Sequence, residues 1–385
     1  MSFREDVEAD LRTLEEQGLR RFPRQVESVQ APRTSVDGRS VLCLCSNNYL
    51  GLSEHPALRR ALSEGAATWG VGAAASRLIS GTMSPHRAAE AALASWLERP
   101  RALLFSSGYA ANVGVIQALL GPADVVFSDR LNHASLIDGA RLSRAKVVIY
   151  DHCDSDDLAR RLRTERGSGR RVLIATESLF SMDGDVAPLA RLRALADEHG
   201  AGLLVDDAHA LGVFGPGGRG LCAEHGIVPD LWVGTLGKAL GLQGAFVAAE
   251  PALVDLIENR ARSYVFSTAS APALAHATVA AVELAQKADF ARAQLRRHFR
   301  RLRAGLRELG YVVLEGDSPI IPVMVGDPLP TMKLSQALLD RGVFVHGIRP
   351  PTVPPGTGRL RVVPMATHTD EDISQALAAF SEVRA

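Results

Sequence analysis

Short apolar runs alternate with longer amphipathic segments between residues 100 and 250. The runs are ALLFSS (102–107), DVVFSD (124–129), KVVIY (146–150), RVLIATES (171–178), GLLVDDAH (202–209), LWVGTL (231–236) and GAFVAA (244–249). Such alternation is typical of βα units, in which helices cover both faces of a mostly parallel sheet. The pattern therefore predicts an α/β fold for this part of the chain.

The pattern changes after residue 285. An Arg-rich helical stretch (291–309) is followed by the apolar run SPIIPVMVG, a helix over 328–341, VFVHGIRP, RLRVVPM and a last helix, which indicates a smaller α+β domain. The apolar residues spaced along the Arg-rich stretch favour a helix with a solvated face over a site for nucleic acid or coenzyme phosphates.

The N-terminal segment shows a third pattern. Val7, Leu11, Leu14 and Leu19 fall on one helical face before Pro23 ends it, which predicts an amphipathic arm. We divide the chain into this arm (1–45), a large domain (46–285) and a small C-terminal domain (286–385).

Composition and charge narrow the function. The 385 residues contain 43 Lys plus Arg and 43 Asp plus Glu, so no net field draws the whole surface to nucleic acid or to an anionic membrane. The N-terminus lacks the apolar centre of a secretory signal, no stretch has the length of a membrane-spanning helix, and we expect a cytoplasmic protein.

The cysteines suggest no cross-links. Cys43, Cys45, Cys153 and Cys222 form neither a Cys-x-x-Cys pair nor a zinc spacing. We expect buried thiols, with no disulfide framework and no metal.

Candidate chemistry lies where the apolar runs end, because parallel sheets bind ligands at the carboxyl ends of their strands. LLFSSGYAAN closes in Gly108-Tyr109 and opens a helix, whose free N–H groups suit a phosphate. By itself this segment also fits a simple Gly turn with a Ser cap. His133 follows the next run, where an isolated loop histidine is usually an ordinary exposed residue. Ser181 lies in the turn of TESLFSMDGD, which equally fits a turn whose Asp and Ser side chains bond their own backbone.

The run LLVDDAHALG ends in a carboxylate that needs a partner. Asp206 closes a buried strand, and an unpaired buried ion pays heavily for its lost hydration. A protonated pyridine nitrogen would satisfy it through a charge-assisted hydrogen bond. His209, three residues later, could lie beside the same ring and donate to its phenolate oxygen.

A lysine follows the strand LWVGT. Lys238 stands among glycines and small residues in TLGKALGLQG, where a surface lysine is the plainer interpretation, but apolar surroundings allow it to lose the proton, as imine chemistry requires. Thr235 can add a hydroxyl to a phosphate. In one chain order, the phosphate turn, the loop His, the strand-ending Asp with its His and this Lys form the set that pyridoxal 5'-phosphate requires.

Over nearly its whole length the chain resembles the α-oxoamine synthases, fold-type I pyridoxal-phosphate enzymes. These condense an amino acid with an acyl thioester and lose carbon dioxide. The motifs that carry the resemblance are CSNNYLGLSEHP, ASRLISGTMSPHRAAEAALASWL, TESLFSMDGDVAPL, VDDAHALGVFGPGGRG and TLGKALG. The resemblance implies a large domain with a mostly parallel seven-stranded sheet, a smaller α+β C-terminal domain, and a homodimer with its active site at the interface.

The resemblance also implies roles for the cofactor residues. Lys238 would carry the cofactor as an imine and act as general base at the substrate Cα, and Asp206 would hold the pyridine nitrogen protonated. The remaining contacts would be His209 and Ser181 near the phenolate oxygen, His133 on the ring face and the substrate carboxylate, Gly108, Tyr109 and Thr235 at the phosphate, and Thr268 at the phosphate across the dimer interface.

Substrate residues come from the same resemblance. Arg361 would bind the substrate carboxylate, because the planar guanidinium group can donate two parallel hydrogen bonds to a carboxylate. Asn47 of the entry motif is a further substrate contact, and Thr352 with Arg20 or Arg21 would contact the acyl substrate.

The segment IRPPTVPPGTGRLRV is similar to the biotin-pathway branch, which condenses L-alanine with a pimeloyl thioester of coenzyme A or a carrier protein to 8-amino-7-oxononanoate. Other α-oxoamine synthases stay open as alternatives: glycine C-acetyltransferase, 5-aminolevulinate synthase, serine palmitoyltransferase or a secondary-metabolism relative. A non-catalytic binding protein with the same fold is the alternative from another class. A nucleotide-binding dehydrogenase is disfavoured because no Gly-x-Gly-x-x-Gly opens the first βα unit.

Overall fold

A computed structural model describes residues 2–167 and 169–384, which form two compact units. The small unit contains the residues up to Tyr49, Met182–Asp185 and those from Ala293 on. The large unit contains Leu50–Ser181 and Val186–Arg292. The N-terminal segment thus belongs to the same unit as the C-terminal part of the chain.

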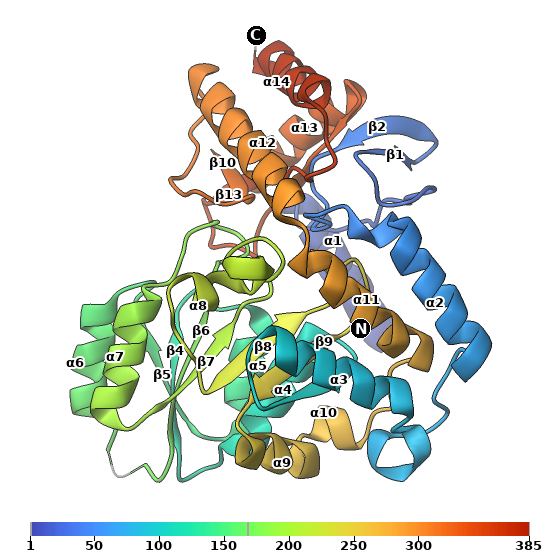
Figure 1. The fold of residues 1–385 in the computed structure, drawn as a ribbon. Helices are drawn as coiled ribbons and strands as arrows, with labels where there is room; N and C mark the ends of the chain where they lie inside the picture. The colour runs from blue at the N-terminus through green and yellow to red at the C-terminus, as the bar shows by residue number, and fades with distance from the viewer. Residues whose placement is uncertain (1, 168, 385) are drawn as a thin grey trace. The chain divides into compact units, whose positions relative to one another are not determined.

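A seven-stranded sheet runs through the large unit (Figure 1). Its strands, in spatial order, are β3 (Arg101–Phe105), β9 (Ala245–Ala249), β8 (Leu231–Thr235), β7 (Gly202–Asp206), β6 (Val172–Glu177), β4 (Val125–Asp129) and β5 (Lys146–Tyr150). Strand β9 is antiparallel to both of its neighbours, and the other neighbouring pairs are parallel. Each apolar run between residues 102 and 249 coincides with one of these strands to within a few residues, so the predicted mostly parallel seven-stranded sheet is confirmed.

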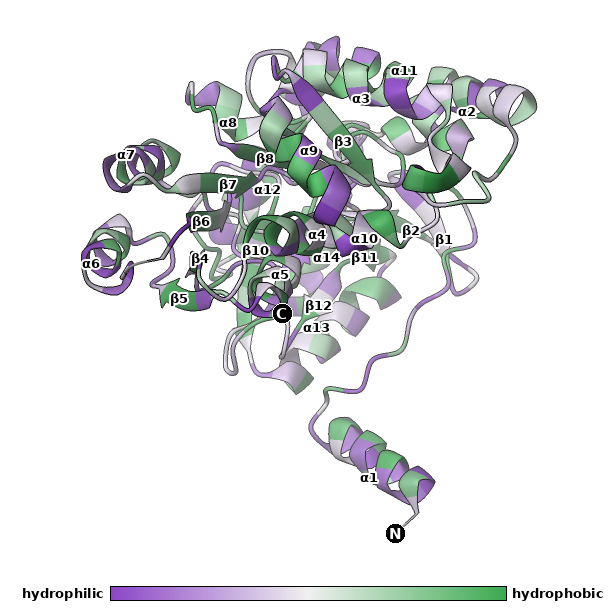
Figure 2. Cartoon of the chain, turned by 90° about the horizontal axis from the view of Figure 1, so that it is seen from below, coloured by the Kyte–Doolittle hydropathy of each residue, from purple (hydrophilic) through white to green (hydrophobic). Residues whose placement is uncertain are grey.

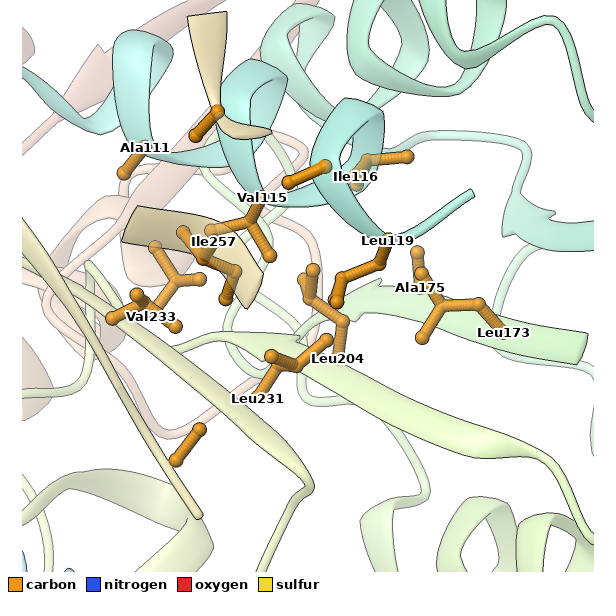
Figure 3. Close-up of a cluster of buried hydrophobic side chains, with 14 of the residues drawn as sticks. Ala111, Val115, Ile116, Leu119, Leu173, Ala175, Leu204, Leu231, Val233 and Ile257 are labelled. Atoms are coloured by element: carbon orange, nitrogen blue, oxygen red, sulfur yellow. The ribbon is translucent and has the colours of Figure 1, made fainter. Parts of the chain in front are cut away.

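Helices cover this sheet and bury its apolar side chains. The helices of the large unit are α2 (Pro56–Trp69), α3 (Ser84–Trp96), α4 (Gly108–Leu119), α5 (Ala134–Ser143), α6 (Ser155–Glu165), α7 (Leu189–His199), α8 (Gly220–Glu224), α9 (Pro251–Arg260), α10 (Arg262–Val265) and α11 (Pro272–Gln286). Short helical turns lie at Leu52–Glu54, Arg77–Gly81 and Pro216–Gly218. Figure 3 shows Val115, Ile116 and Leu119 of α4 above Leu204 of β7, all at most 6% exposed. Burying one such side chain contributes about 1.5–3 kcal/mol.

Asp207, directly after the strand-ending Asp206, connects several neighbouring elements of the large unit through hydrogen bonds. It is fully buried, and its carboxylate accepts hydrogen bonds from the indole of Trp232 (3.0 Å), the hydroxyl of Ser178 and the N–H of Leu221 (3.3 Å). Burial raises the pKa of Asp207 to about 6 against these donors. The second aspartate of VDDAH therefore joins β6, β8 and α8.

The small unit combines helices with two small sheets, which gives the α+β character expected for the C-terminal part. Its elements are α1 (Phe3–Glu16), β1 (Arg33–Val36), β2 (Arg39–Cys43), α12 (Asp289–Glu308), β10 (Ile321–Gly326), α13 (Pro328–Asp340), β11 (Val343–Phe344), β12 (His346–Ile348), β13 (Gly358–Val362) and α14 (Asp370–Arg384). The first residues of α12 belong to the large unit. One sheet has the strand order β1-β2-β11 and the other has β10-β13-β12.

The Arg-rich stretch forms α12, with an apolar stripe and a mixed arginine face. Leu295 and Phe299 are buried, while Arg300 is exposed and binds the carboxylate of Asp317 with two hydrogen bonds of 2.6 and 2.8 Å. Arg303 departs from the predicted solvated face: it is only 6% exposed and donates to backbone carbonyl oxygens.

The predicted N-terminal helix is shorter than its apolar pattern. Helix α1 ends at Glu16, because Gly18 adopts a left-handed φ of 67°, and Leu19 therefore lies outside the helix. None of its described residues is buried, and Figure 2 shows apolar and polar residues interleaved along it. No helix within residues 2–167 and 169–384 combines the length and apolar character needed to cross a bilayer.

Candidate active site

Several of the predicted cofactor residues of the large unit lie at or just after the carboxyl ends of neighbouring strands. Asp206 at the end of β7 and Glu177 at the end of β6 are direct partners in the parallel ladder. Side chains at paired positions project to the same face of a sheet. The charges of Asp206 and Lys238 act on both His133 and Glu177, so these groups share one environment.

Asp206 is a buried carboxylate held by neutral donors. It is 8% exposed, and it accepts hydrogen bonds from the side-chain amide of Asn112 (2.6 Å) and the N–H of Ala208 (3.0 Å). A buried carboxylate is stabilised strongly by a cation in contact with it. The position therefore suits a positively charged ring nitrogen.

A chain of hydrogen bonds connects this carboxylate to His133. The amide nitrogen of Asn112 also donates to the hydroxyl of Ser135 at 2.9 Å, and that hydroxyl lies 2.7 Å from Nδ1 of His133. Because the backbone N–H of Ser135 donates to Nδ1 (3.2 Å), the neutral imidazole carries its proton on Nε2. Burial lowers the pKa of His133, although the charge of Asp206 opposes this. His133 is thus a neutral ring at physiological pH.

Glu177 is a site residue that the strand-end pattern did not assign. It is 3% exposed, and burial, with the charge of Asp206, raises its pKa to about 8. Backbone N–H groups of His133 and Ser181 donate to its carboxyl group. With a pKa of about 8, Glu177 is protonated at neutral pH, so the two buried acids Glu177 and Asp206 do not repel each other. The hydrogen bonds to Glu177 also fix the loops that carry His133 and Ser181. The polar end of RVLIATES was the available signal, but its neighbour Asp206 is 29 residues away in sequence and cannot be seen locally.

The predicted phosphate turn is the first turn of α4. Ser107 caps the helix by accepting the N–H of Ala110 (3.1 Å), and the N–H groups of Gly108 and Tyr109 belong to the first turn, which offers no helical acceptors. A Cβ added to Gly108 would meet no atom within 4 Å, so a ligand can approach the backbone closely. The hydroxyl of Tyr109 donates to Asp138, which raises the pKa of the tyrosine.

The other predicted cofactor residues have varied exposure. Thr235 ends β8, and its hydroxyl donates to the carbonyl of Gly244 at 3.0 Å. Ser181 and His209 are buried, whereas Lys238 lies partly exposed in the turn after β8. Thr268 is exposed, and its backbone pairs with Ser76 in an isolated antiparallel bridge.

Two of the predicted substrate residues meet in the small unit. Arg361 of β13 donates from Nη1 to the amide oxygen of Asn47 at 2.9 Å, and the hydroxyl of Tyr49 donates to the same oxygen at 3.3 Å. Arg361 is 6% exposed. Burial raises the pKa of Tyr49, against the nearby charge of Arg361. The arrangement presents a positioned guanidinium that can bind a carboxylate.

The two N-terminal arginines, Arg20 and Arg21, have different partners among the remaining predicted substrate residues. Arg21 donates from Nη2 to the hydroxyl of Thr352 (3.3 Å) and to the carbonyl of Pro350 (3.0 Å). Arg20 instead binds Glu15 at 2.6 Å. Of the two arginines, Arg21 is therefore the one that contacts Thr352.

Both arginines line a cavity of about 790 Å³ in the small unit. Its wall also carries Arg349 and His346 beside the apolar side chains of Leu329, Met332 and Phe344. Burial and the charges of neighbouring arginines lower the pKa of His346. A long apolar chain with an anionic end fits such a lining.

The residues around Asp206 fit pyridoxal phosphate. Within the described residues, the buried atoms Oε1 of Glu177 and Oδ1 of Asn112 have no hydrogen-bond partner. A flat ring with a protonated nitrogen would place a cation beside the carboxylate of Asp206. The amine of Lys238 is close enough to interact with the same charges, and the start of α4 provides N–H groups for a phosphate.

Comparisons with known proteins agree with this chemistry. Residues 39–380 match the family model described as aminotransferase class I and II. A protein named 8-amino-7-oxononanoate synthase from Geobacter sulfurreducens is 49% identical over 381 residues, covering 98% of this chain and 97% of the relative. Its namesake from Trichlorobacter lovleyi is 50% identical over 371 residues, covering 95% of this chain and 94% of the relative. The solved serine palmitoyltransferase of Sphingomonas wittichii superimposes with a TM-score of 0.92 at 33% identity, covering 98% of this chain and 96% of that one.

Proposed function

The chain belongs to the class I and II aminotransferase family, and from this premise we propose that it condenses L-alanine with a pimeloyl thioester. The products are 8-amino-7-oxononanoate, carbon dioxide and the free thiol, and the chain is a pyridoxal-phosphate-dependent acyltransferase of biotin biosynthesis. The observation that carries the proposal is the identity of 47–50% over nearly the whole chain to relatives named 8-amino-7-oxononanoate synthase.

Residues of the large unit would hold the cofactor. When bound, pyridoxal phosphate supplies an electron sink for the bonds broken at the substrate Cα. Lys238 would bind it covalently through its amine, Asp206 would keep its ring nitrogen protonated, and His209 and Ser181 would contact the phenolate oxygen. The first turn of α4 and Thr235 would bind the phosphate.

Proton transfer at the substrate Cα would fall to Lys238. As a free amine beside the substrate, Lys238 would take the Cα proton and return one after carbon dioxide has left. His133 would pack on the ring face in its neutral form, because burial lowers its pKa. Its Nε2–H could then donate to the substrate carboxylate.

Residues of the small unit would bind the two carboxylates of the substrates. We assign the amino-acid carboxylate to Arg361, whose Nη1 is positioned by Asn47 at 2.9 Å. We assign the far carboxylate of the pimeloyl chain to Arg21 with Thr352, beside the apolar wall of the 790 Å³ cavity. We do not assign this carboxylate to Arg20, because Arg20 forms an ion pair with Glu15.

A homodimer is part of the proposal. Val71, Ile79 and Phe266 are 84%, 81% and 71% exposed, and in sequence they lie within about five residues of Ser76 or Thr268, which pair in an isolated bridge. Large exposed apolar side chains favour burial against another protein surface. A second copy would cover them and could take Thr268 into its phosphate site. The cytoplasmic location stays a prediction.

The test is the mass of the product. Purified holoenzyme is incubated with alanine, glycine or serine, each with pimeloyl, acetyl, succinyl or palmitoyl thioesters. The proposal requires that alanine with pimeloyl thioester be turned over with the highest kcat/KM and give 8-amino-7-oxononanoate. The runner-up is a serine palmitoyltransferase, favoured by solved structures with TM-scores of 0.92 and 0.93, and it would show highest activity with serine and palmitoyl thioester.

A further inference from the structure

Three residues with metal-binding side chains meet outside the proposed active-site cluster. Asp129 ends β4, and His152 and Cys153 lie in the turn between β5 and α6. One ligand atom from each lies within 4.8 Å of the others. All three belong to the large unit. The cofactor and substrate roles described above use none of them.

Asp129 fixes the direction in which the imidazole of His152 points. The aspartate is 2% exposed, and its Oδ1 lies 2.8 Å from Nδ1 of His152. A carboxylate can only accept at this distance, so Nδ1 carries the proton and Nε2 carries the lone pair. The ring of Phe180 packs perpendicular to the imidazole, with the ring centres 4.4 Å apart. The histidine is therefore held in one tautomer and one orientation.

The same aspartate also fixes the cysteine. The backbone N–H of Cys153 donates to Oδ2 of Asp129 at 2.9 Å, and Cys153 has a left-handed φ of 54°, which residues with a Cβ seldom adopt. The sulfur of Cys153 consequently lies 3.7 Å from Nε2 of His152. The side chain of His152 is 21% exposed, so an ion can reach the pair from solvent.

The distance between sulfur and nitrogen matches a tetrahedral zinc ion. Zinc binds cysteine sulfur at about 2.3 Å and histidine nitrogen at about 2.0–2.1 Å, and a tetrahedral angle between these bonds separates the two ligand atoms by about 3.6 Å. The observed 3.7 Å, which in this structure is a sulfur–nitrogen hydrogen bond between the two side chains, is close to this separation. A carboxylate behind the ring is the usual partner of a zinc-bound histidine, because it makes the ligand nitrogen more basic.

We propose that Cys153 and His152 bind a thiophilic divalent metal ion, with zinc as the best match, and that Asp129 orients the histidine. Thiolate and imidazole together favour zinc over magnesium or calcium, which prefer oxygen ligands. Binding releases the thiol proton of Cys153 into solvent, so the affinity rises with pH. Two protein ligands leave two tetrahedral positions for water.

The test uses the holoenzyme and zinc itself. Isothermal titration with Zn²⁺ is expected to show one ion per chain, and X-ray absorption at the zinc edge is expected to show one sulfur neighbour at about 2.3 Å. In Cys153→Ser the sulfur neighbour disappears and the affinity falls at least tenfold. Asp129→Asn, which removes the orienting charge, is expected to weaken binding about 10–100-fold.

Controls separate this site from other thiols and from misfolding. Cys222→Ala removes a cysteine elsewhere in the large unit and should bind zinc as the wild type does. His152→Gln should lose the ion, and far-ultraviolet circular dichroism together with cofactor absorbance reports whether each variant is folded. A folded Cys153→Ser that retains the sulfur neighbour, or a wild type that binds no stoichiometric zinc at micromolar concentrations, overturns the proposal.

Discussion

The side-chain amide of Asn112 donates to the carboxylate of Asp206 at 2.6 Å, which fixes the orientation of the acid that faces the proposed cofactor site. The same nitrogen donates to the hydroxyl of Ser135 at 2.9 Å, and Ser135 contacts Nδ1 of His133. One residue in the second turn of α4 thus sets the position of the acid and, through Ser135, of the histidine.

Replacing Asn112 is expected to weaken cofactor binding. A hydrogen bond to a charged group contributes about 1.5–3 kcal/mol, so Asn112→Ala should lower the affinity for pyridoxal phosphate at least about tenfold. Titration of the apoenzyme followed by absorbance measures this. Asn259→Ala, in the exposed part of α9, is the matched control and should bind normally. Equal affinities of the two variants would contradict the role of Asn112.

Lys238 is expected to be essential for turnover. Lys238→Ala should lose essentially all product formation, because no other amine is assigned to hold the cofactor and move the Cα proton. Borohydride reduction of the wild-type holoenzyme, followed by peptide mass spectrometry, should find the cofactor on Lys238. The control Lys287→Ala removes an exposed lysine after α11 and should leave activity intact. A cofactor attached to another lysine would contradict the assignment of Lys238.

Arg361 is expected to determine the affinity for the amino acid. Arg361→Lys keeps the charge but loses the planar fork that binds a carboxylate with two hydrogen bonds, so KM for alanine should rise about 10–100-fold. KM for the thioester should change little. Asn47→Ala should shift the same constant by less, because it removes only the residue that positions Nη1. The control variant is Arg300→Lys, on the exposed face of α12, which should leave KM for alanine unchanged. An unchanged KM in Arg361→Lys would show that another residue binds the carboxylate of the amino acid.

Arg21 and Arg20 are expected to differ in their effect on the acyl substrate. Arg21→Ala should raise KM for pimeloyl thioester about tenfold or more, by loss of one charge-assisted contact, and leave KM for heptanoyl thioester almost unchanged. Heptanoyl has the same chain length but no terminal carboxylate. Arg20→Ala should have a smaller effect, since Arg20 already binds Glu15. Steady-state kinetics with both thioesters checks this, and equal effects on the two would exclude a carboxylate contact.

The buried His368 predicts a pH dependence of stability. Burial lowers its pKa from 6.5 to about 4, and its Nδ1 accepts the N–H of Met365 at 2.8 Å. Between pH 4 and pH 6.5 the side chain of His368 is protonated in the unfolded chain but neutral in the folded protein. The free energy of unfolding therefore rises as pH rises from 4 to 6.5, by an amount on the order of 3 kcal/mol for this group.

The variant His368→Gln isolates that contribution. Glutamine can still accept the backbone N–H but does not titrate, so the difference in stability between pH 4 and pH 7 should shrink by about the same amount. Denaturant unfolding at both pH values measures it. An unchanged pH dependence would show that His368 is not the titrating group.

Much of the large unit could be predicted because its signals are local. Each of the seven strands is a run of apolar residues flanked by turn residues, and the carboxyl ends of parallel strands meet at one edge of a sheet. Asp206, His209, Thr235 and Lys238 can therefore be proposed as cofactor residues from their places at or just after the ends of such runs. The end of α1 was missed because Gly18 interrupts a pattern whose apolar spacing continues to Leu19.

Other site residues have no local signal. Asn112 lies in an apolar helix, and its partner Asp206 is 94 residues away, so nothing near it suggests a polar role. The pKa of Glu177 is raised by burial and by the charge of Asp206 beside it in the ladder, and both depend on the folded structure. The choice between Arg20 and Arg21 depends on which of them reaches Thr352 across 331 residues of sequence.

The sequence by itself determined the sheet, the order of the cofactor residues and the motifs of the family, since these depend on the periodicity of side chains and on short segments. Only the tertiary structure decided which polar groups share protons and hydrogen bonds. The cluster of Asp129, His152 and Cys153 illustrates the reason: Asp129 ends β4, whereas His152 and Cys153 follow β5, so the pairing of β4 with β5 brings the acid to the other two residues across more than 20 positions of sequence.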